Sequence, residues 1–328
     1  MNLFKRFTKT LAVSAAICFS QVGFADKAET VNFGIISTDS TQVLRASWTP
    51  FLDDMSKKMG VEVKPFFASD YAGIIQAMRF DKVDVAWYGN KSAMEAVDRA
   101  GGQVFAQTVD NEGNPGYWSL LLTHKDSALN SVDDVLKNAK DLTFGNGDPN
   151  STSGYLVPSY YVFAKNNIDP KKAFKRVVNA NHETNALAVA NDKIDFATNN
   201  TENLRRIEEN FPDKFANIKV IWKSPLIPSD PIVWRKNLPE SVKGKIYTFF
   251  MSYGKSGDKQ ELANLDKLQW APFRPSSDDQ LLPIRQLALF KDRLKELSRG
   301  NNEAVQKIDS ELAELNRRMA ALQSMAAN

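Results

Sequence analysis

The sequence predicts an α/β protein built as two lobes joined by two extended crossings, and three observations lead to this prediction. Strand and helix patterns alternate through residues 31–97, and a second alternating series runs through residues 132–209. Two extended stretches, 104–122 and 218–234, are long enough to pass between the lobes. The chain of 328 residues also exceeds the usual size of one domain, roughly 100 to 150 residues.

The first lobe is predicted from three short apolar strands, each followed by a helix. The strands are residues 31–36, 61–67 and 83–89. The helix after the first strand has apolar residues at helical spacing and ends at Gly60. Asp70 and Tyr71 open the next helix. Strands that alternate with helices in this way are typical of a parallel sheet.

The second lobe repeats the pattern and the chain then returns to the first lobe. Its predicted strands are 142–145, 174–178 and 194–198, and its predicted helices are 155–166, 186–190 and 203–209. Beyond the second crossing, 241–253 and 284–297 are predicted to be helical and 270–273 irregular. Two lobes joined by two crossings imply a hinge and a cleft. We therefore expect lobe 1 at 26–120 and 232–298, lobe 2 at 121–231, and a C-terminal helix at 299–328.

Residues 1–25 are predicted to be a cleavable secretory signal. Lys5, Arg6 and Lys9 form its basic region, an apolar run follows, and Gly23-Phe24-Ala25 is a small-x-small cleavage site before Asp26. This segment holds three of the 42 basic residues and no acidic residue, so the mature chain has 39 of each. No later apolar run is long enough to span a bilayer. The sequence thus predicts a soluble exported protein, and its charge does not indicate nucleic-acid binding.

Most catalytic and metal chemistries are disfavoured by the residue content. The chain has two histidines, and its single cysteine lies in the signal, so a transition-metal site is not expected. The glycines at 145 and 147 lack the third glycine of a dinucleotide fingerprint. Ser151, His182 and Asp230 could form a triad on paper, but no Gly-x-Ser-x-Gly elbow accompanies them. We expect neither an enzyme nor a cofactor.

An anion site is predicted where residues 144–154 turn from a strand into a helix. Asn150 or Ser151 is the natural N-cap, and the hydroxyls of Ser151, Thr152 and Ser153 crowd the first turn. Amides at a helix start lack intrahelical partners and favour a phosphate-like group. The alternative is an ordinary helix capped by a hydroxyl.

Further polar and aromatic residues follow strand ends or lie in the crossings, where they would face the same cleft. Each has a structural explanation of its own, such as packing for a tyrosine or helix capping for His182. Their common position nevertheless favours a binding site. The candidates are Tyr71, Tyr117, His182, Glu202 and Asp230.

Several strings in this chain resemble those of the periplasmic phosphonate-binding proteins that serve bacterial ATP-binding-cassette (ABC) importers. The strings cover nearly all of residues 31–290. The two most specific are Asp-Pro-Asn-Ser-Thr-Ser-Gly at 148–154 and Asn-Asn-Thr-Glu-Asn at 199–203. The resemblance implies a bilobed periplasmic-binding-protein fold of the type II solute-binding class, which closes on its ligand. It also implies a membrane permease as partner and 2-aminoethylphosphonate as ligand.

The resemblance further implies which residues hold each end of that ligand. Glu202 and Asp230, with Tyr117 nearby, would bind the ammonium group. The phosphonate oxygens would be held by Tyr71, Ser151, Thr152, Ser153 and His182. A binding protein for phosphate or phosphite stays open as an alternative, because it needs the same anion site without paired acids. A phosphonate-processing hydrolase is the more distant alternative.

The C-terminal tail is predicted to be a helix that pairs two copies of the chain. Apolar residues recur at alternating spacings of three and four, with charged residues between them, as in a coiled-coil seam. The alternative is a helix that lies on the first lobe. The seam residues are Val305, Ile308, Leu312, Leu315, Met319 and Leu322.

Overall fold

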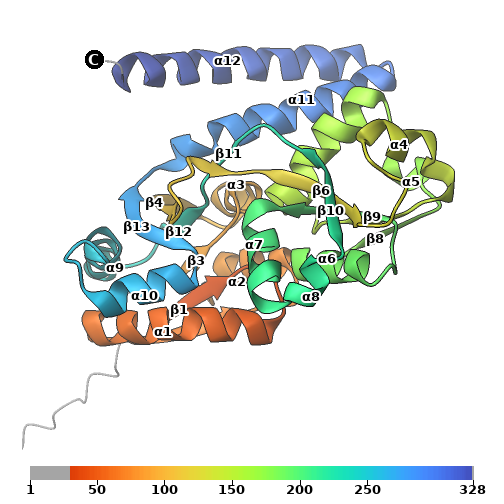
Figure 1. The fold of residues 1–328 in the computed structure, drawn as a ribbon. Helices are drawn as coiled ribbons and strands as arrows, with labels where there is room; N and C mark the ends of the chain where they lie inside the picture. Colours follow the sequence, from red (N-terminus) through yellow and green to blue (C-terminus); the bar gives the residue numbers. More distant parts are fainter. Residues whose placement is uncertain (1–29, 327–328) are drawn as a thin grey trace, which may run out of the picture.

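The computed structural model describes residues 30–326 and forms two α/β lobes, each built on its own sheet (Figure 1). A six-stranded sheet belongs to the first lobe and a five-stranded sheet to the second. The predicted α/β class and two-lobe arrangement are confirmed. The predicted signal, residues 1–25, lies outside the described residues.

The first-lobe sheet has the strand order β13-β4-β12-β3-β1-β2. β1 runs parallel to β2 and β3, whereas β12, which enters after the second crossing, is antiparallel to both neighbours. The strands are β1 (Thr30–Ile35), β2 (Glu62–Phe67), β3 (Val85–Trp87), β4 (Gly102–Asp110), β12 (Pro231–Arg235) and β13 (Trp270–Pro275). The helices of this lobe are α1 (Thr41–Met59), α2 (Tyr71–Arg79), α3 (Asn90–Arg99), α9 (Glu240–Ser252) and α10 (Lys259–Lys267).

Strand β13 corrects the prediction that residues 270–273 are irregular. It is an edge strand that pairs with β4, and its register shifts between Ala271 and Arg274. Pro272 and Pro275 suggested a loop, but proline is tolerated at a sheet edge and at a bulge. The chain reaches this edge through α10, which the sequence analysis did not predict.

The second-lobe sheet has the strand order β10-β6-β9-β7-β8. β7 is parallel to β8 and β9, so the carboxyl ends of these strands lie at one edge, where α6 and α7 begin. The strands are β6 (Ser119–His124), β7 (Thr143–Asn146), β8 (Arg176–Asn179), β9 (Phe196–Asn200) and β10 (Ile218–Lys223). The helices are α4 (Val132–Lys137), the 3₁₀ turn η1 (Ala139–Asp141), α5 (Pro170–Ala173), α6 (His182–Ala190), α7 (Thr201–Asn210) and α8 (Pro212–Phe215).

The predicted helix at 155–166 is helical but not a regular α-helix. It consists of two π-helical segments, η2 (Thr152–Leu156) and η3 (Ser159–Phe163), and a final 3₁₀ turn, η4 (Ala164–Asn166). Pro158 lies between the π segments and has no amide hydrogen to donate to an earlier turn. Wide turns of this kind are frequent at functional sites.

The two crossings lie side by side as a small two-stranded sheet. β5 (Gly116–Tyr117) pairs antiparallel with β11 (Ile227–Pro228). A Cβ atom on Gly116 would lie 2.1 Å from the backbone oxygen of Ile227, so only glycine permits this close approach. The paired crossings are where the lobes can rotate relative to each other.

The C-terminal helices form a hairpin on top of the molecule (Figure 1). The 3₁₀ turn η5 (Asp278–Leu281) leads into α11 (Leu282–Ser298), which contacts α3 in the first lobe and the π-helical region in the second. α12 (Asn302–Ala326) then folds back along α11, where Val305 and Leu312 are buried. Arg293 pairs with Asp309 at 2.5 Å, and Arg318 pairs with Asp279. Residues of the predicted seam therefore pack within the same chain.

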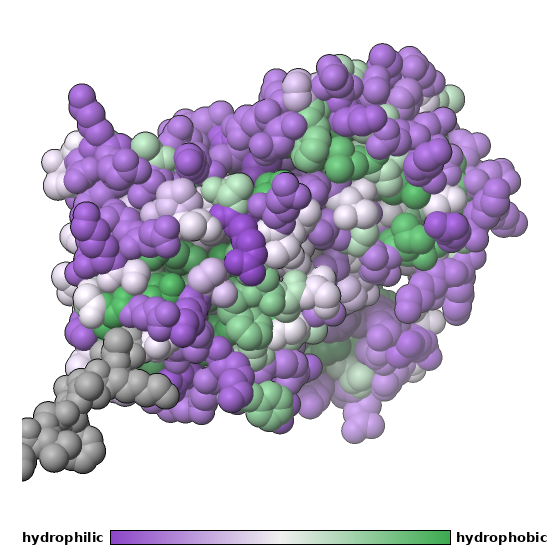
Figure 2. Space-filling view, turned by 90° about the horizontal axis from the view of Figure 1, so that it is seen from below, coloured by the Kyte–Doolittle hydropathy of each residue, from purple (hydrophilic) through white to green (hydrophobic). Residues whose placement is uncertain are grey.

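The face of the molecule on the side of α1 is mostly hydrophilic (Figure 2). Seen from the side of α1 and α10, purple side chains surround separate apolar patches (Figure 2). Between residues 30 and 326, no helix combines the length and apolar character that crossing a bilayer requires.

Candidate functional site

All eight residues predicted for the site line one enclosed cavity between the lobes. The lobe 1 loops after β1 and β3 face the lobe 2 loops after β7 and β9 across it. The cavity has a volume of about 10 Å³, which is room for roughly one water molecule. Its lining includes Tyr71, Tyr117, Ser151, Thr152, Ser153, His182, Glu202 and Asp230.

One end of the cavity is lined by the three hydroxyls at the start of η2. Ser151, Thr152 and Ser153 are each 2% exposed. The Ser151 hydroxyl oxygen caps the segment by accepting a hydrogen bond from the Gly154 amide at 2.9 Å. The turn before it closes tightly, since the Gly147 amide donates to the Gly154 carbonyl oxygen, and a Cβ atom on Gly147 would lie 2.5 Å from the Gly154 backbone. The local sequence therefore presents consecutive hydroxyls without a basic residue among them.

His182 is the first residue of α6 and completes this end. Its Nε2 atom lies 3.4 Å from the Ser151 hydroxyl oxygen and 3.5 Å from that of Ser153. Burial lowers the pKa of His182 to about 4, although the nearby Asp39 charge opposes the shift. The imidazole is therefore neutral near pH 7, and an anion here depends on hydrogen-bond donors, with no formal positive charge from this ring.

Asp230 lines the same cavity from the second crossing, just before β12. Its Oδ1 accepts a hydrogen bond from the Tyr117 hydroxyl at 2.9 Å, and its Oδ2 accepts one from Trp87 Nε1 at 3.1 Å. Asp230 is 5% exposed. Burial raises its pKa well above the ordinary value, and the Glu202 charge raises it further.

Glu202 stands near Asp230, in the first turn of α7. Burial raises its pKa, the Arg206 charge lowers it, and Asp110 raises it. Its carboxylate makes no hydrogen bond or ion pair with any other residue that the structure describes. Two carboxylates held this way repel each other, and a cation between them would relieve that cost.

Direct hydrogen bonds and ion pairs hold the two lobes together around the cavity. The Lys91 amide of lobe 1 donates to Thr152 Oγ1 of lobe 2 at 2.8 Å, and the Tyr71 amide donates to Asp148 at 3.2 Å. On the acidic side, Asp39 accepts a hydrogen bond from Asn203 at 2.7 Å and lies 3.4 Å from Arg206 Nε. The lobes are therefore closed on the site, and a ligand can enter only when they separate.

Several residues that line the cavity were not predicted from the sequence. Trp87 lies in the predicted strand 83–89 and Asn200 in the string at 199–203, but neither was assigned to the site. Arg206 lies one helical turn beyond Glu202, a relation that follows from helix geometry. The main residues added by the structure are Thr38, Trp87, Asn200 and Arg206.

The site does not form a hydrolytic triad. Ser151 and His182 are near each other, but Nδ1 of His182 is buried and has no hydrogen-bond partner among the described residues. Asp230 bonds Tyr117 and Trp87 instead. A triad needs a carboxylate on that nitrogen to orient the imidazole.

Comparison with known proteins shows which family the chain resembles. Residues 33–281 match the family model described as "ABC transporter, phosphonate, periplasmic substrate-binding protein". The chain is 60% identical to the phosphonates-binding periplasmic protein of Escherichia coli, over 98% of this chain and 95% of that protein. It is 29% identical to a phosphate-import protein of Mycolicibacterium smegmatis, over 68% of this chain and 71% of the relative.

A solved structure also matches over most of both chains. It is a binding protein component of an ABC phosphonate transporter from Pseudomonas aeruginosa, with a TM-score of 0.88 and 59% identity. The match covers 90% of this chain and 99% of the other.

Proposed function

Because this chain belongs to the periplasmic substrate-binding proteins of phosphonate ABC transporters, we propose that its ligand is 2-aminoethylphosphonate. As a member of that family it binds a small phosphonate and works with a membrane permease, and it is not an enzyme. Family membership gives the class of ligand, and our proposal concerns which phosphonate is bound.

The observation that supports this choice is the chemical composition of the cavity lining. It combines hydroxyls and a neutral imidazole with two carboxylates, Glu202 and Asp230. A zwitterion with an anionic phosphonate and a cationic ammonium matches both kinds of group. The ammonium would replace part of the hydration that the two carboxylates lose when the lobes close.

In this proposal the phosphonate oxygens accept hydrogen bonds from Tyr71, Ser151, Thr152, Ser153 and His182. Hydrogen bonds to a charged group are shorter and stronger than neutral ones, which offsets the absence of a salt bridge. Tyr117 orients Asp230 through its hydroxyl, at 2.9 Å, so that the carboxylate faces the ammonium.

The lobe boundaries and the export signal are also proposals. Lobe 1 comprises 26–120 and 232–298, lobe 2 comprises 121–231, and the tail begins at 299. The contacts of α11 with both lobes make it a bridge at the hinge. The family is periplasmic, which agrees with cleavage of residues 1–25 and export of a chain beginning at Asp26.

Dimerisation through the tail stays a prediction. Because the buried seam residues of α12 pack on α11, two copies would have to meet through the outer face of this hairpin.

Phosphate or phosphite is the competing ligand class, because the chain is also similar to a phosphate-import protein. Calorimetric titration with 2-aminoethylphosphonate, inorganic phosphate and phosphite tests the proposal. We expect 2-aminoethylphosphonate to bind at least about 100-fold more tightly, equivalent to about 2.7 kcal/mol. Equal or tighter binding of phosphate or phosphite would show that the acids do not select the ligand. Phosphate release during incubation with 2-aminoethylphosphonate would instead indicate a hydrolase.

A further inference from the structure

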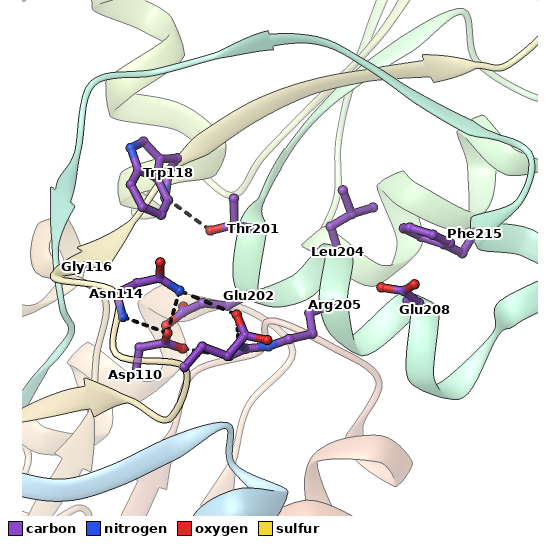
Figure 3. Close-up of a pocket in the computed structure, with 11 residues that line it drawn as sticks. Asp110, Asn114, Gly116, Trp118, Thr201, Glu202, Leu204, Arg205, Glu208 and Phe215 are labelled. Atoms are coloured by element: carbon purple, nitrogen blue, oxygen red, sulfur yellow. Dashed lines mark hydrogen bonds and ion pairs between the residues drawn. The ribbon is translucent and has the colours of Figure 1, made fainter.

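A second cavity, of about 320 Å³, lies on the outer side of Glu202 (Figure 3). α7 forms one wall, and Trp118 with the turn from β4 to β5 forms the other. Among the residues that line the two cavities, Glu202 is the one that both share. Glu202 therefore borders both the enclosed cleft and this wider cavity.

Near Glu202, consecutive residues of the chain line different cavities. Tyr117 lines the cleft, whereas its neighbour Trp118 lines the outer cavity. In the same way Asn200 faces the cleft and Thr201 the outer cavity. The enclosed cleft and the outer cavity are therefore neighbours at Glu202.

The outer cavity carries an excess of negative charge. Arg205 is its one basic lining residue, and it pairs with Asp110 at 2.7 Å and Glu112 at 2.8 Å (Figure 3). Glu202 and Glu208 have no hydrogen bond or ion pair with another residue between 30 and 326. Two carboxylates therefore remain available to a cationic group.

Building on the proposed function, we propose that the site also binds phosphonates whose amine nitrogen carries a further cationic chain. The phosphonate occupies the enclosed cleft, the nitrogen lies beside Glu202, and the chain passes into the outer cavity toward Glu208. A substituent on the carbon next to phosphorus would instead lie between the lobes, which are joined around the cleft by the hydrogen bonds of Lys91 with Thr152 and of Tyr71 with Asp148. Tolerance should therefore be high at the nitrogen and low at that carbon.

Calorimetry with four ligands tests this asymmetry. They are 2-aminoethylphosphonate, its N-butyl derivative, its N-(4-aminobutyl) derivative and its isomer with butyl on the carbon next to phosphorus. We expect N-butyl to bind within about tenfold of the parent and the carbon-substituted isomer at least about 100-fold more weakly. The terminal ammonium should improve binding over N-butyl by about two- to fivefold, as for an exposed ion pair.

Two substitutions at Glu208 assign the effect to this cavity. Glu208 is exposed and unbonded among the described residues, so parent binding should change by less than about twofold. Glu208→Gln should remove the advantage of the terminal ammonium. Glu208→Trp should fill the outer end and weaken both N-substituted ligands at least fivefold, while leaving the parent unaffected.

The results separate this inference from the proposed function. If the parent binds tightly but the N-butyl derivative binds more than about 100-fold more weakly, the site has no space for a chain on the nitrogen. The further inference then fails, while the proposed function stands. Unchanged binding of the N-substituted ligands to Glu208→Trp would place the chain elsewhere and also overturn it. If 2-aminoethylphosphonate itself does not bind, the proposed function fails.

Discussion

Thr152 links anion recognition to lobe closure, because its hydroxyl oxygen is already shared between the lobes. Thr152 Oγ1 accepts the Lys91 amide at 2.8 Å, which leaves its hydroxyl hydrogen available for a ligand oxygen. A single hydroxyl can thus act as acceptor across the lobes and donor to the phosphonate.

Replacement of this hydroxyl should weaken phosphonate binding. Thr152→Val nearly keeps the shape and Thr152→Ala removes the side chain, and each should cost roughly 1.5 to 3 kcal/mol, the range for a hydrogen bond to a charged group. Thr152→Ser is the matched control and should keep most of the affinity. Calorimetry measures all three, and unchanged affinity in the Val and Ala variants would place the anion elsewhere.

The paired acids should make selectivity for the amine depend on pH. Burial raises the pKa of Asp230 and of Glu202, and a bound ammonium favours their ionised forms. Binding of the amine ligand therefore releases protons, and its affinity falls as pH falls. Ethylphosphonate shares the anion end, including His182, but does not need ionised acids.

The affinity ratio of 2-aminoethylphosphonate to ethylphosphonate isolates this effect once each affinity is corrected for the separately measured ionisation of its own phosphonate group, because the ammonium lowers the second phosphonate pKa of the amine ligand. We expect the ratio to decrease steadily when pH is lowered from 8 to 5. A ratio that is flat or rises on acidification would contradict a role for the acids in binding ammonium.

Individual site residues could be predicted from the sequence where one short stretch contains both a turn and side chains that can bind the ligand. The run from Asp148 to Gly154 is such a stretch, and the acids at 202 and 230 follow strands or crossings in the same way. Arg206 and Thr38 could not be found like this. Arg206 has one local signal, its spacing of one helical turn from Glu202, but whether either side chain reaches the cavity depends on how the second lobe packs against the first.

At the scale of elements, regular strands and helices with clear caps were predictable. Gly60 ends α1 in a left-handed conformation, and Asp70 caps α2 because its Oδ1 accepts a hydrogen bond from the Gly73 amide at 2.8 Å. The π-helical geometry of η2 and η3 was not predictable, because the apolar spacing of 155–166 also fits an α-helix. The edge strand β13 was missed since its prolines indicate a loop unless the neighbouring strand is known.

The hairpin of α11 and α12 is the element whose role is most open to test. Light scattering of the full chain at tens of micromolar should report a dimer if its outer face pairs two copies. Deletion of residues 300–328 should then return the mass to that of a monomer. A full-length protein that is already monomeric at this concentration would rule out dimerisation through the tail.

At the scale of the whole molecule, two lobes and two crossings followed from the order of strands and helices. The antiparallel pairing of β5 with β11, and the small apolar cluster joining them to α11, could not be deduced in this way. These contacts join segments that are far apart in the sequence. They matter for function because the hinge determines how Tyr71 of lobe 1 closes on the hydroxyls and Glu202 of lobe 2.

Closure around a zwitterion is tested most directly by removing one acid at a time. Wild type, Glu202→Gln and Asp230→Asn are titrated with 2-aminoethylphosphonate and with ethylphosphonate. In wild type, ethylphosphonate leaves both carboxylates desolvated and unpaired, so it should bind more weakly by roughly two or more powers of ten. Each variant should lose far more affinity for 2-aminoethylphosphonate than for ethylphosphonate, so the ratio of the two affinities should decrease. An undiminished ratio in both variants would contradict the assignment of Glu202 and Asp230 to the ammonium.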